Sequence, residues 1–396
     1  MKLHSPIAAL LLGGLALGLA GPALAELNQS PPNAAGQQPV FAGQTRAPEL
    51  TDGVALRPQV VVSGLDSPWG LALLPDGDWL ITERPGRLRL LSKGELSEPI
   101  RNLPKVDARG QGGLLDVAVD RDFPRTRQIW FSFAEPRGEG KNGTTVATAH
   151  LSADGRALER LRVIFRQQPA WASDKHFGSR IVPDGRGGLF VTTGERSVPS
   201  ARPLAQDVNT HLGKVLHIDA QTGAGLPGNP FATGKGRPEI WSWGHRNIQS
   251  AALDAQGRLW TVEHGARGGD ELNRPQAGRN YGWPIITYGE DYSGRPIGKG
   301  QTQAKGMEQP VYYWDPVIAP SGMVVYDGKL EPKMRGDILI GGLKAQSVVR
   351  LKLQGDRVVG EQHLATGIGR VRDIAEAPDG ALMVLTDEGR LLRLAP

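Results

Sequence analysis

The chain has 396 residues, among them 53 Gly and 30 Pro, and carries a net charge of +5 at neutral pH. It contains no Cys, which excludes disulfides, thiolate metal centres, iron–sulfur clusters and c-type haem attachment. Basic residues are scattered among acidic ones, without a Lys/Arg run or a basic stripe interleaved with aromatics, so the composition argues against nucleic-acid binding.

The N-terminal stretch 1–25 is typical of a signal peptide. Lys2 precedes an apolar run, and Ala23-Leu24-Ala25 forms an A-x-A cleavage site. The run is too short and too rich in Gly for a membrane-spanning helix, with an uncleaved anchor as the alternative. No later segment is apolar enough to span a membrane, so we expect export, most simply to a bacterial periplasm. Residues 26–55 are rich in Pro, Gln and Ala, which predicts a flexible N-terminal segment.

One motif recurs along the rest of the chain: an apolar strand, a turn of Pro, Asp and Gly, and a second β-branched or aromatic strand. Six copies occur, at 68–91, 112–136, 176–196, 247–265, 319–353 and 371–394. Recurrence of this kind predicts an all-β fold, and a six-bladed β-propeller of four-stranded antiparallel blades over 56–396 fits best. The strand "LRPQVVVSG" near residue 60 has no hairpin partner of its own. We expect it to complete the last blade beside the C-terminal strands and so close the ring.

The copy at 176–196 holds a titratable pair. If Pro183 and Gly188 flank its turn, counting outward sets His176 opposite Glu195. Cross-strand Cβ atoms lie roughly 5 Å apart, close enough for a carboxylate to orient an imidazole. This is half of a general-base arrangement, and a purely structural histidine is the alternative.

Superposing the six copies predicts that polar residues from several blades meet at one mouth of the central channel. Several of them are cationic, which indicates a multiply anionic ligand. No Walker loop or dinucleotide fingerprint occurs, and "GQGG" at 110–113 is too short to be one, so a nicotinamide cofactor is not expected. The residues placed at the mouth are Gln111, His176, Arg246, Asn247, Pro320, Ser321, Arg370 and Arg372 from first strands, and Glu195, Glu263, His264 and Lys344 from second strands.

The segment 263–284 combines clustered Gly with acidic and amide side chains. Asp270, Glu271 and Asn273 supply hard oxygen, the ligand type that calcium prefers, although the spacing is not that of an EF-hand. Loops of this composition are also ordinary turns, so the pattern alone leaves both readings open.

Eight motifs in order give the chain a family resemblance over about 55–396. The chain resembles the soluble pyrroloquinoline-quinone (PQQ)-dependent sugar dehydrogenases, and within them the aldose sugar dehydrogenase branch. The motifs are "SPWGLALLPDGDWLITERPG", "GQGGLLDVA", "HFGSR", "GHRN", "EHGARGGDELN…GRNYGWP", "IAPSGM", "GGLK" and "RVRD".

The resemblance implies a six-bladed propeller with the quinone in the channel mouth. It implies that His176 is the base, that Glu195 orients it, and that Arg246 stabilises charge on the reducing quinone. Two departures from the family stand out: Ala266, where proline is common, and Glu195, where aspartate is often found. The implied cofactor contacts are Gln111, Arg246, Asn247, Lys344, Arg370 and Arg372, with Tyr292, Leu343 and Ala345 as weaker candidates. The implied calcium ligands are the carbonyls of Gly265 and Ala266, with Glu271 and Tyr281 in a second site.

The activity implied by the resemblance is oxidation of the C1 hydroxyl of an aldose to the lactone, with hydride passing to the quinone. Electrons would then go to an external acceptor, since the chain offers no haem site of its own. Short connections between the strands argue for an open sugar pocket, and a monomer is the default. Two other classes stay open: a calcium-dependent lactonase and a non-catalytic binding propeller, which fold alone cannot separate from an enzyme.

Overall fold

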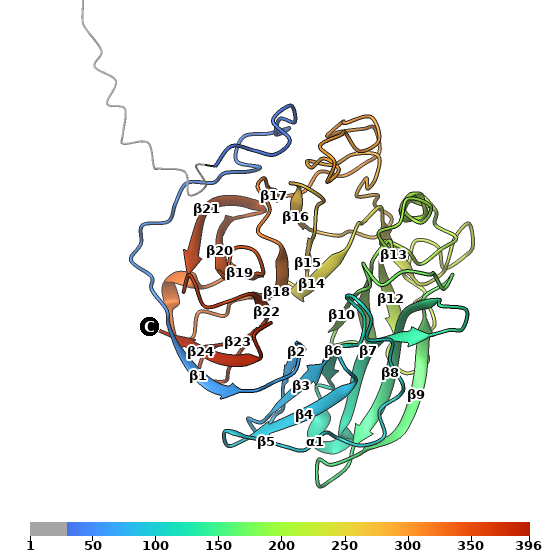
Figure 1. Cartoon of the computed structure of the whole chain (residues 1–396), viewed down its shortest axis with the longest axis vertical. Helices are drawn as coiled ribbons and strands as arrows, with labels where there is room; N and C mark the ends of the chain where they lie inside the picture. The colour runs from blue at the N-terminus through green and yellow to red at the C-terminus, as the bar shows by residue number, and fades with distance from the viewer. Residues whose placement is uncertain (1–29) are drawn as a thin grey trace, which may run out of the picture.

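The computed structural model describes residues 30–396 and forms a closed ring of six sheets (Figure 1). Each sheet has four antiparallel strands, which confirms the predicted six-bladed propeller. The predicted signal peptide at 1–25 lies outside the described residues. Within residues 30–396, no helix is long and apolar enough to cross a membrane.

Blades 1 to 5 are each built from four strands that follow one another along the chain, from the channel outward. Blade 1 holds β2 (Pro68–Leu73), β3 (Trp79–Glu83), β4 (Arg87–Ser92) and β5 (Glu95–Leu96). Blade 2 holds β6 (Leu114–Val119), β7 (Gln128–Pro136), β8 (Asn142–Leu151) and β9 (Leu158–Arg166). Blade 3 holds β10 (Gly178–Pro183), β11 (Gly188–Thr193), β12 (Lys214–Asp219) and β13 (Ile240–Trp243). Blade 4 holds β14 (Ile248–Leu253), β15 (Leu259–Glu263), β16 (Asp270–Asn273) and β17 (Tyr312–Trp314). Blade 5 holds β18 (Pro320–Val325), β19 (Ile338–Gly342), β20 (Ser347–Gln354) and β21 (Arg357–Leu364).

Blade 6 joins the two ends of the described chain. It holds β22 (Val371–Glu376), β23 (Leu382–Thr386), β24 (Arg390–Ala395) and, outermost, β1 (Arg57–Ser63). β1 pairs antiparallel with β24, as the sequence predicted. The strand that precedes blade 1 in the chain is thus the outer strand of blade 6, and this pairing closes the ring. Helical structure in residues 30–396 is limited to α1 (Phe123–Thr126) and two 3-10 turns, η1 (Arg202–Gln206) and η2 (Pro332–Met334).

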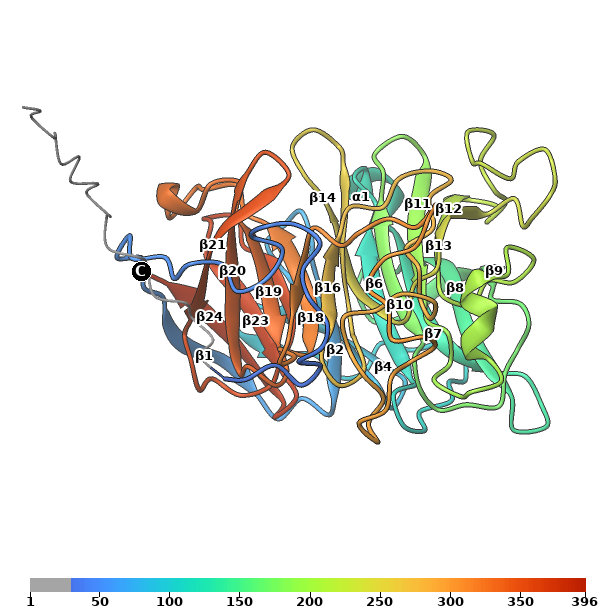
Figure 2. The ribbon, with the colours of Figure 1, turned by 90° about the horizontal axis from the view of Figure 1, so that it is seen from above.

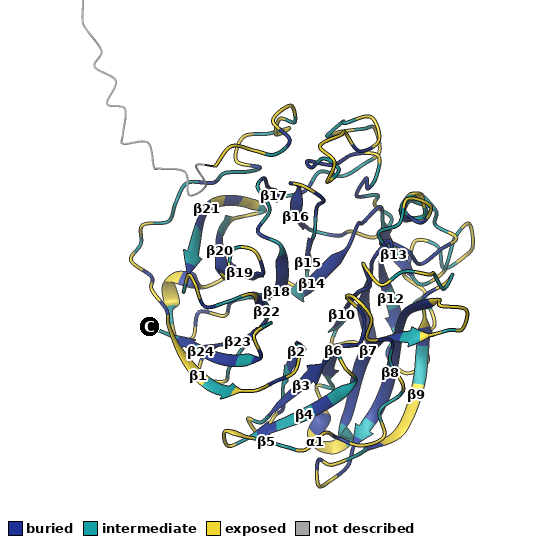
Figure 3. Ribbon diagram, in the orientation of Figure 1, coloured by how far each residue is buried: buried dark blue, intermediate teal, exposed yellow. Residues whose placement is uncertain are grey.

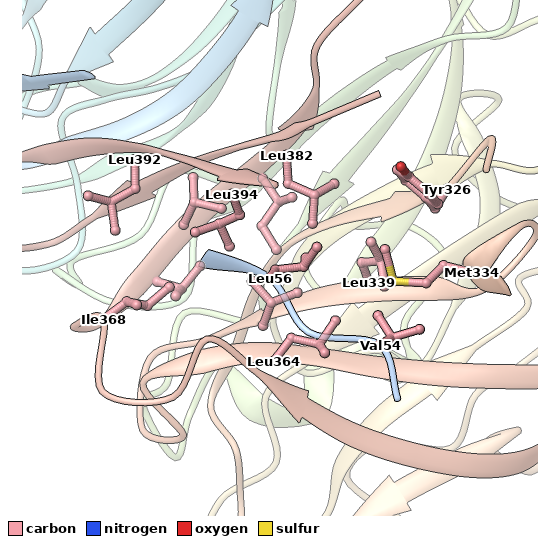
Figure 4. Close-up of a cluster of buried hydrophobic side chains, with 14 residues drawn as sticks. Val54, Leu56, Tyr326, Met334, Leu339, Leu364, Ile368, Leu382, Leu392 and Leu394 are labelled. Carbon is pink, nitrogen blue, oxygen red and sulfur yellow. The ribbon is translucent and has the colours of Figure 1, made fainter. Parts of the chain in front are cut away.

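The hydrophobic core lies between neighbouring blades rather than at the centre of the ring (Figure 3). Six clusters of buried side chains occupy the six junctions, one at each. Figure 4 shows the junction between blades 5 and 6, where Leu339 of blade 5 belongs to one buried cluster with Leu382 and Leu392 of blade 6, and with Val54 and Leu56 from the N-terminal segment. A smaller apolar cluster of Trp69, Leu115, Ala134 and Phe177 lies at the channel mouth, where three of its members join polar side chains in lining the channel cavity.

The inner strands β2, β6, β10, β14, β18 and β22 contact one another in a ring around the channel. Each one shifts register near its start against the second strand of its blade. Such a bulge adds twist and redirects the chain. A bulge therefore sets the direction of the chain at the start of each inner strand, at the channel mouth. Viewed from the side in Figure 2, the strands run between two faces that carry the loops.

The segment before β1 differs from the flexible one expected over 26–55. Residues 30–55 have almost no regular structure, but the described part packs along blades 4 and 5. Gln44 is fully buried and donates through Nε2 to the Pro310 carbonyl at 3.0 Å. The Ala47 N–H donates to the Tyr312 hydroxyl at 2.8 Å. These contacts join residues far apart in the chain, and they leave no hydrophobic periodicity in the local sequence. The Pro-, Gln- and Ala-rich composition therefore predicted a flexible segment.

Candidate active site

A cavity of about 200 Å³ lies at the mouth of the channel where the inner strands begin. Five of the predicted cofactor contacts line it: Gln111, Asn247, Leu343, Arg370 and Arg372. The other lining residues are Trp69, Arg84, Leu115, Phe177, Gly178, Gln249, His264 and Ala319. The structure thus gathers residues from all six blades at one place. The repeat comparison predicted a contribution from five of them, and blade 1 adds Trp69 and Arg84.

His176 and Glu195 meet beside this cavity. The His176 Nδ1 lies 2.7 Å from Glu195 Oε1, and the two residues are 5% and 1% exposed. The carboxylate is held in turn, because its Oε2 accepts the Ser197 N–H at 3.0 Å. The His176 N–H donates to Gln111 Oε1 at 2.8 Å, which ties the imidazole residue to the cavity wall. His176 has φ +51°, a left-handed backbone that is uncommon outside Gly and typical of functional positions.

The environment of this imidazole disfavours its protonated form. Burial, and after it the positive charge of Arg246, lower the pKa of His176 well below its usual value. Burial also raises the pKa of Glu195. With Nδ1–H donated to Glu195, the Nε2 atom has no partner among the described residues. The neutral ring is therefore set up to accept a proton at Nε2.

Three arginines meet around the cavity with one carboxylate between them. Arg370 Nε and Arg372 Nε both donate to Asp387, at 3.0 and 2.8 Å. Arg84 donates to the Gly110 carbonyl at 2.5 Å and, in the described part of the chain, forms no ion pair. Burial and the neighbouring Arg372 lower the pKa of Arg84. The cluster has a surplus of positive charge that an anionic ligand would neutralise.

Arg246 is buried and does not line the channel cavity. Its Nη1 donates to the His264 carbonyl at 3.1 Å, its guanidinium stands 5.2 Å from the Trp283 ring, and its buried Nε has no partner. His264 lines the channel cavity and donates from Nε2 to the Pro320 carbonyl at 2.7 Å, while burial lowers its pKa to about 3. It is therefore a fixed neutral wall of the site rather than a second base.

Three predicted contacts lie elsewhere. Lys344 and Ala345 line a second, larger cavity on the other side of the loop that carries Leu343. Tyr292 is 73% exposed at the tip of a surface loop and does not line the channel cavity.

A small cavity of about 10 Å³ lies next to Arg246, with room for roughly one water-sized sphere. Glu263 and Glu271 both line it. Burial and the negative charge of Glu263 raise the pKa of Glu271 well above its usual value. Asn273 Nδ2 donates to both carboxylates at 3.0 Å, and its buried Oδ1 has no partner. Two buried carboxylates side by side, with an unpaired amide oxygen close by, fit a bound cation.

Backbone oxygens complete this donor set. Gly265 also lines the small cavity, and a Cβ added to it would overlap the carbonyl oxygens of Gly268 and Gly269, so several carbonyls converge there. Ala266 follows directly and is 8% exposed. The Tyr281 hydroxyl donates to the Arg274 carbonyl, so a metal would meet the backbone of Tyr281 rather than its hydroxyl. Residues 30–396 contain no cluster of three His, Cys, Asp or Glu side chains suited to a metal, so an ion here would depend on carbonyls, as Ca²⁺ accepts.

Among the residues that the sequence did not reveal are Trp69, Arg84 and Gln249, which line the channel cavity, and Asp387, which accepts from Arg370 and Arg372 beside it. Arg84 and Asp387 each follow the second strand of their blade directly, in blades 1 and 6. His264 occupies the same place in blade 4, directly after β15, so the comparison extended to all six copies identifies Arg84 and Asp387 as well. Trp69 and Gln249 sit within inner strands, and no signal in the sequence separated them from core positions.

Comparison with known proteins places this propeller in the class of sugar dehydrogenases. The chain is a member of the Glucose / Sorbosone dehydrogenase family, whose sequence model matches residues 65–393.

Relatives and solved structures agree with this membership. The aldose sugar dehydrogenase YliI of Escherichia coli is 44% identical over 347 residues, which cover 85% of this chain and 92% of that protein. The crystal structure of the soluble aldose sugar dehydrogenase of Escherichia coli in the apo form superposes with a TM-score of 0.83 at 43% identity, covering 86% of this chain and all of that one. The PQQ-bound aldose sugar dehydrogenase of Streptomyces coelicolor superposes with a TM-score of 0.71 at 29% identity, covering 86% and 98%.

Proposed function

We propose that this protein is a PQQ-dependent aldose sugar dehydrogenase, which oxidises the C1 hydroxyl of an aldose to the lactone and passes the electrons to an external acceptor. The names of its relatives support both the substrate class and the cofactor. We further propose that the mature protein is exported to the periplasm after loss of 1–25, and that it acts as a monomer.

The observation that carries this proposal is the His176–Glu195 pair beside a cationic cavity. Glu195 fixes the tautomer of His176 by accepting its Nδ1–H, so Nε2 is the atom that takes the proton from the C1 hydroxyl of the sugar. Glu195 then stabilises the imidazolium that forms. Arg246, whose charge disfavours that imidazolium, places positive potential where negative charge develops during the oxidation.

The cationic cavity fits the proposed cofactor. PQQ carries three carboxylates and, when bound, supplies the two-electron acceptor for the hydride. Gln111, Asn247, Arg370 and Arg372 would hold it, with Arg84 as a further cation. Lys344 would have to turn from the second cavity toward the channel to join them, and Tyr292 would need its loop to move.

Calcium is proposed as the second cofactor. The carbonyls of Gly265 and Ala266 would bind one ion near the quinone, and Glu271 with the backbone of Tyr281 would bind another. Carboxylates and carbonyls are the ligands that Ca²⁺ prefers, and a cation there would relieve the repulsion between Glu263 and Glu271.

Reconstitution tests the proposal. Purified apo-protein should show almost no dye-linked oxidation of glucose, PQQ with calcium should restore it, and PQQ with a chelator should not, if the metal is removed first. His176→Ala should still bind PQQ but lose about 10²–10⁴-fold in turnover, the usual worth of a positioned base. A well-folded apo-protein that neither binds PQQ nor oxidises any aldose would overturn the dehydrogenase assignment in favour of a binding propeller.

A further inference from the structure

The N-terminal segment builds a second cavity that the family does not account for. Residues 30–49 precede the family match, which begins at 65. Together with blades 4 and 5 they enclose a cavity of about 580 Å³, larger than the channel cavity and within the range typical of small-molecule sites.

The segment is fixed in place over this cavity. Asp315 accepts the N–H groups of Asn33 and Ala34, both at 2.9 Å. Arg46 donates to the Asp315 carbonyl at 2.8 Å, and the Leu50 N–H donates to the Glu361 carbonyl at 2.9 Å. These bonds tie residues far apart in the chain, so the wall is a built part of the fold.

The second cavity adjoins the channel cavity. Ile318 and Lys344 line the second cavity, while the residues next to them in the chain, Ala319 and Leu343, line the channel cavity. The wall between the two is held by the Leu343 N–H bond to the Ala319 carbonyl at 2.9 Å and the Lys344 N–H bond to the Ile318 carbonyl at 3.0 Å. The two cavities therefore lie on opposite sides of one short wall, made by the segments that carry Ile318 with Ala319 and Leu343 with Lys344.

The second cavity offers a ligand both hydrogen-bond donors and hydrogen-bond acceptors. The Glu361 carboxylate is already engaged by the Tyr312 hydroxyl and the Trp314 Nε1–H. Glu49 and Lys344 have no side-chain partner in the described part of the chain, so one acceptor and one donor remain.

Thr366 adds a hydroxyl that can both donate and accept. The His363 Nε2 lies 3.3 Å from Glu361 Oε1, and its Nδ1 has no partner in the described part of the chain, so Nδ1 is the atom it offers a ligand. Carboxylates and cations line the cavity together, which disfavours a strongly charged ligand. A neutral molecule with many hydroxyls, each able to donate and accept, matches this set. Pro316, Val317 and Ile318 supply apolar surface for the carbon face of such a ligand.

We propose that the second cavity binds a further sugar unit of an oligosaccharide whose reducing end lies in the channel cavity. The proposal rests on the aldose oxidation proposed above for the channel. It assigns to the N-terminal segment the recognition of longer sugars, with Glu49 from the segment and His363 from β21 as the hydrogen-bonding pair.

Binding to the apo-protein tests this without turnover. Maltotriitol and cellotriitol are reduced trisaccharides that lack an anomeric hydroxyl and cannot be oxidised at C1. We expect calorimetry to detect binding of at least one of them to the wild type. Thr366→Trp, which fills the cavity from an exposed position, should weaken that binding at least tenfold. His363→Ala should weaken it as well, and Thr233→Trp, at an exposed position on blade 3, should leave it unchanged.

Two results would overturn the subsite: no binding of either trisaccharide to the wild type, or equal binding by wild type and Thr366→Trp. In the enzyme loaded with PQQ and calcium, Thr366→Trp should lower kcat/KM for maltotriose or cellotriose at least fivefold and leave glucose within twofold. If the variant instead raises the KM for the electron acceptor with every sugar, the cavity serves the acceptor and the proposal is wrong. If the wild type oxidises no aldose but binds the trisaccharides, the failure is that of the channel chemistry.

Discussion

At the scale of single residues, the protonation state of His176 decides when the site can work. Its pKa lies well below the usual value because burial and Arg246 both disfavour the charged ring. A lowered pKa means that the neutral, proton-accepting form persists as the pH falls.

The acid limb of the pH profile should therefore lie below the ordinary histidine pKa of about 6.5. We expect kcat/KM for glucose to stay constant from pH 8 down through 6.5 and to fall only at lower pH. Arg246→Gln removes the largest charge acting on the ring, so its acid limb should move to higher pH. A wild-type limb at or above 6.5, unmoved in Arg246→Gln, would show that His176 is not the titrating base.

Arg84 is the arginine of the cavity that lacks a carboxylate partner in the described part of the chain. A charge-assisted contact in a partly shielded site contributes about 1.5–3 kcal/mol, so Arg84→Gln should weaken PQQ binding by the apo-protein about 10- to 100-fold. Arg84→Lys should retain part of the affinity. Arg57→Gln, an exposed arginine on β1, is the matched control and should bind normally. Equal affinity of the wild type and Arg84→Gln by calorimetry would remove Arg84 from the anion site.

The sequence predicted the location of site residues whose position follows from the repeat. It did not predict the location of side chains on loops that can face either of two cavities. Gln111, Asn247 and Arg372 reach the cavity because each lies at or just before the start of an inner strand, at the channel mouth. Lys344 sits on a loop between two cavities, and the N-terminal segment forms one wall of the second cavity. No local pattern carries that information.

At the scale of elements, the His176–Glu195 contact depends on a bulge. The prediction paired Pro183 with Gly188 and counted outward, whereas the structure pairs Pro183 with Leu189. The register then shifts between Gly178 and Ile181, and beyond the shift Gly178 faces Thr193. The predicted register at the turn is wrong by one residue, since Pro183 pairs with Leu189 rather than Gly188. The bulge shifts the register back by one residue, so His176 and Glu195 still meet as predicted. A bulge of this kind leaves no mark in hydrophobic alternation.

Gly194, which directly follows β11, tests whether the backbone around His176 is held in place by close packing. A Cβ there would overlap the carbonyl of His176, and the backbone cannot yield without moving the imidazole. Overpacking of this kind costs about 1–3 kcal/mol, so Gly194→Ala should lower the free energy of unfolding by that amount and also reduce kcat. Gly228→Ala, where an added Cβ meets nothing within 4 Å, should change neither quantity. Full activity in Gly194→Ala would mean that the position of His176 is not critical.

At the scale of the whole molecule, the ring could be predicted because it is periodic. Six copies of one motif gave the blade number, and the orphan strand near residue 60 gave the closure through β1 and β24. The N-terminal segment repeats nothing, so its packing against blades 4 and 5 could not be inferred from composition.

The channel itself is held by one buried ion-pair cluster that joins three blades. Arg180 of β10 donates to Asp116 of β6 at 2.8 Å and to Asp373 of β22 at 3.0 Å, and its guanidinium lies 4.8 Å from the ring of Trp69 at the floor of the cavity. One cation faces two carboxylates, and burial raises the pKa of Asp116 to about 6. Because this folded-state pKa lies above the unfolded value, the proton on Asp116 contributes stability that is lost as the pH rises through about 6.

Arg180→Met should destabilise the fold, because Arg180 is the cation that faces both buried carboxylates. It leaves two buried carboxylates without a cation, which costs about 3–5 kcal/mol when they are ionised. Both folded-state pKa values then lie above the unfolded ones, so protonation favours the folded state and the deficit against the wild type should shrink as the pH falls from 8 to 5. Urea unfolding at the two pH values measures it. Arg258→Met breaks more exposed pairs with Asp254 and Asp356 and should cost less than about 1 kcal/mol at either pH. A deficit for Arg180→Met as small as that of Arg258→Met, or one independent of pH, would show that the channel does not depend on the cluster.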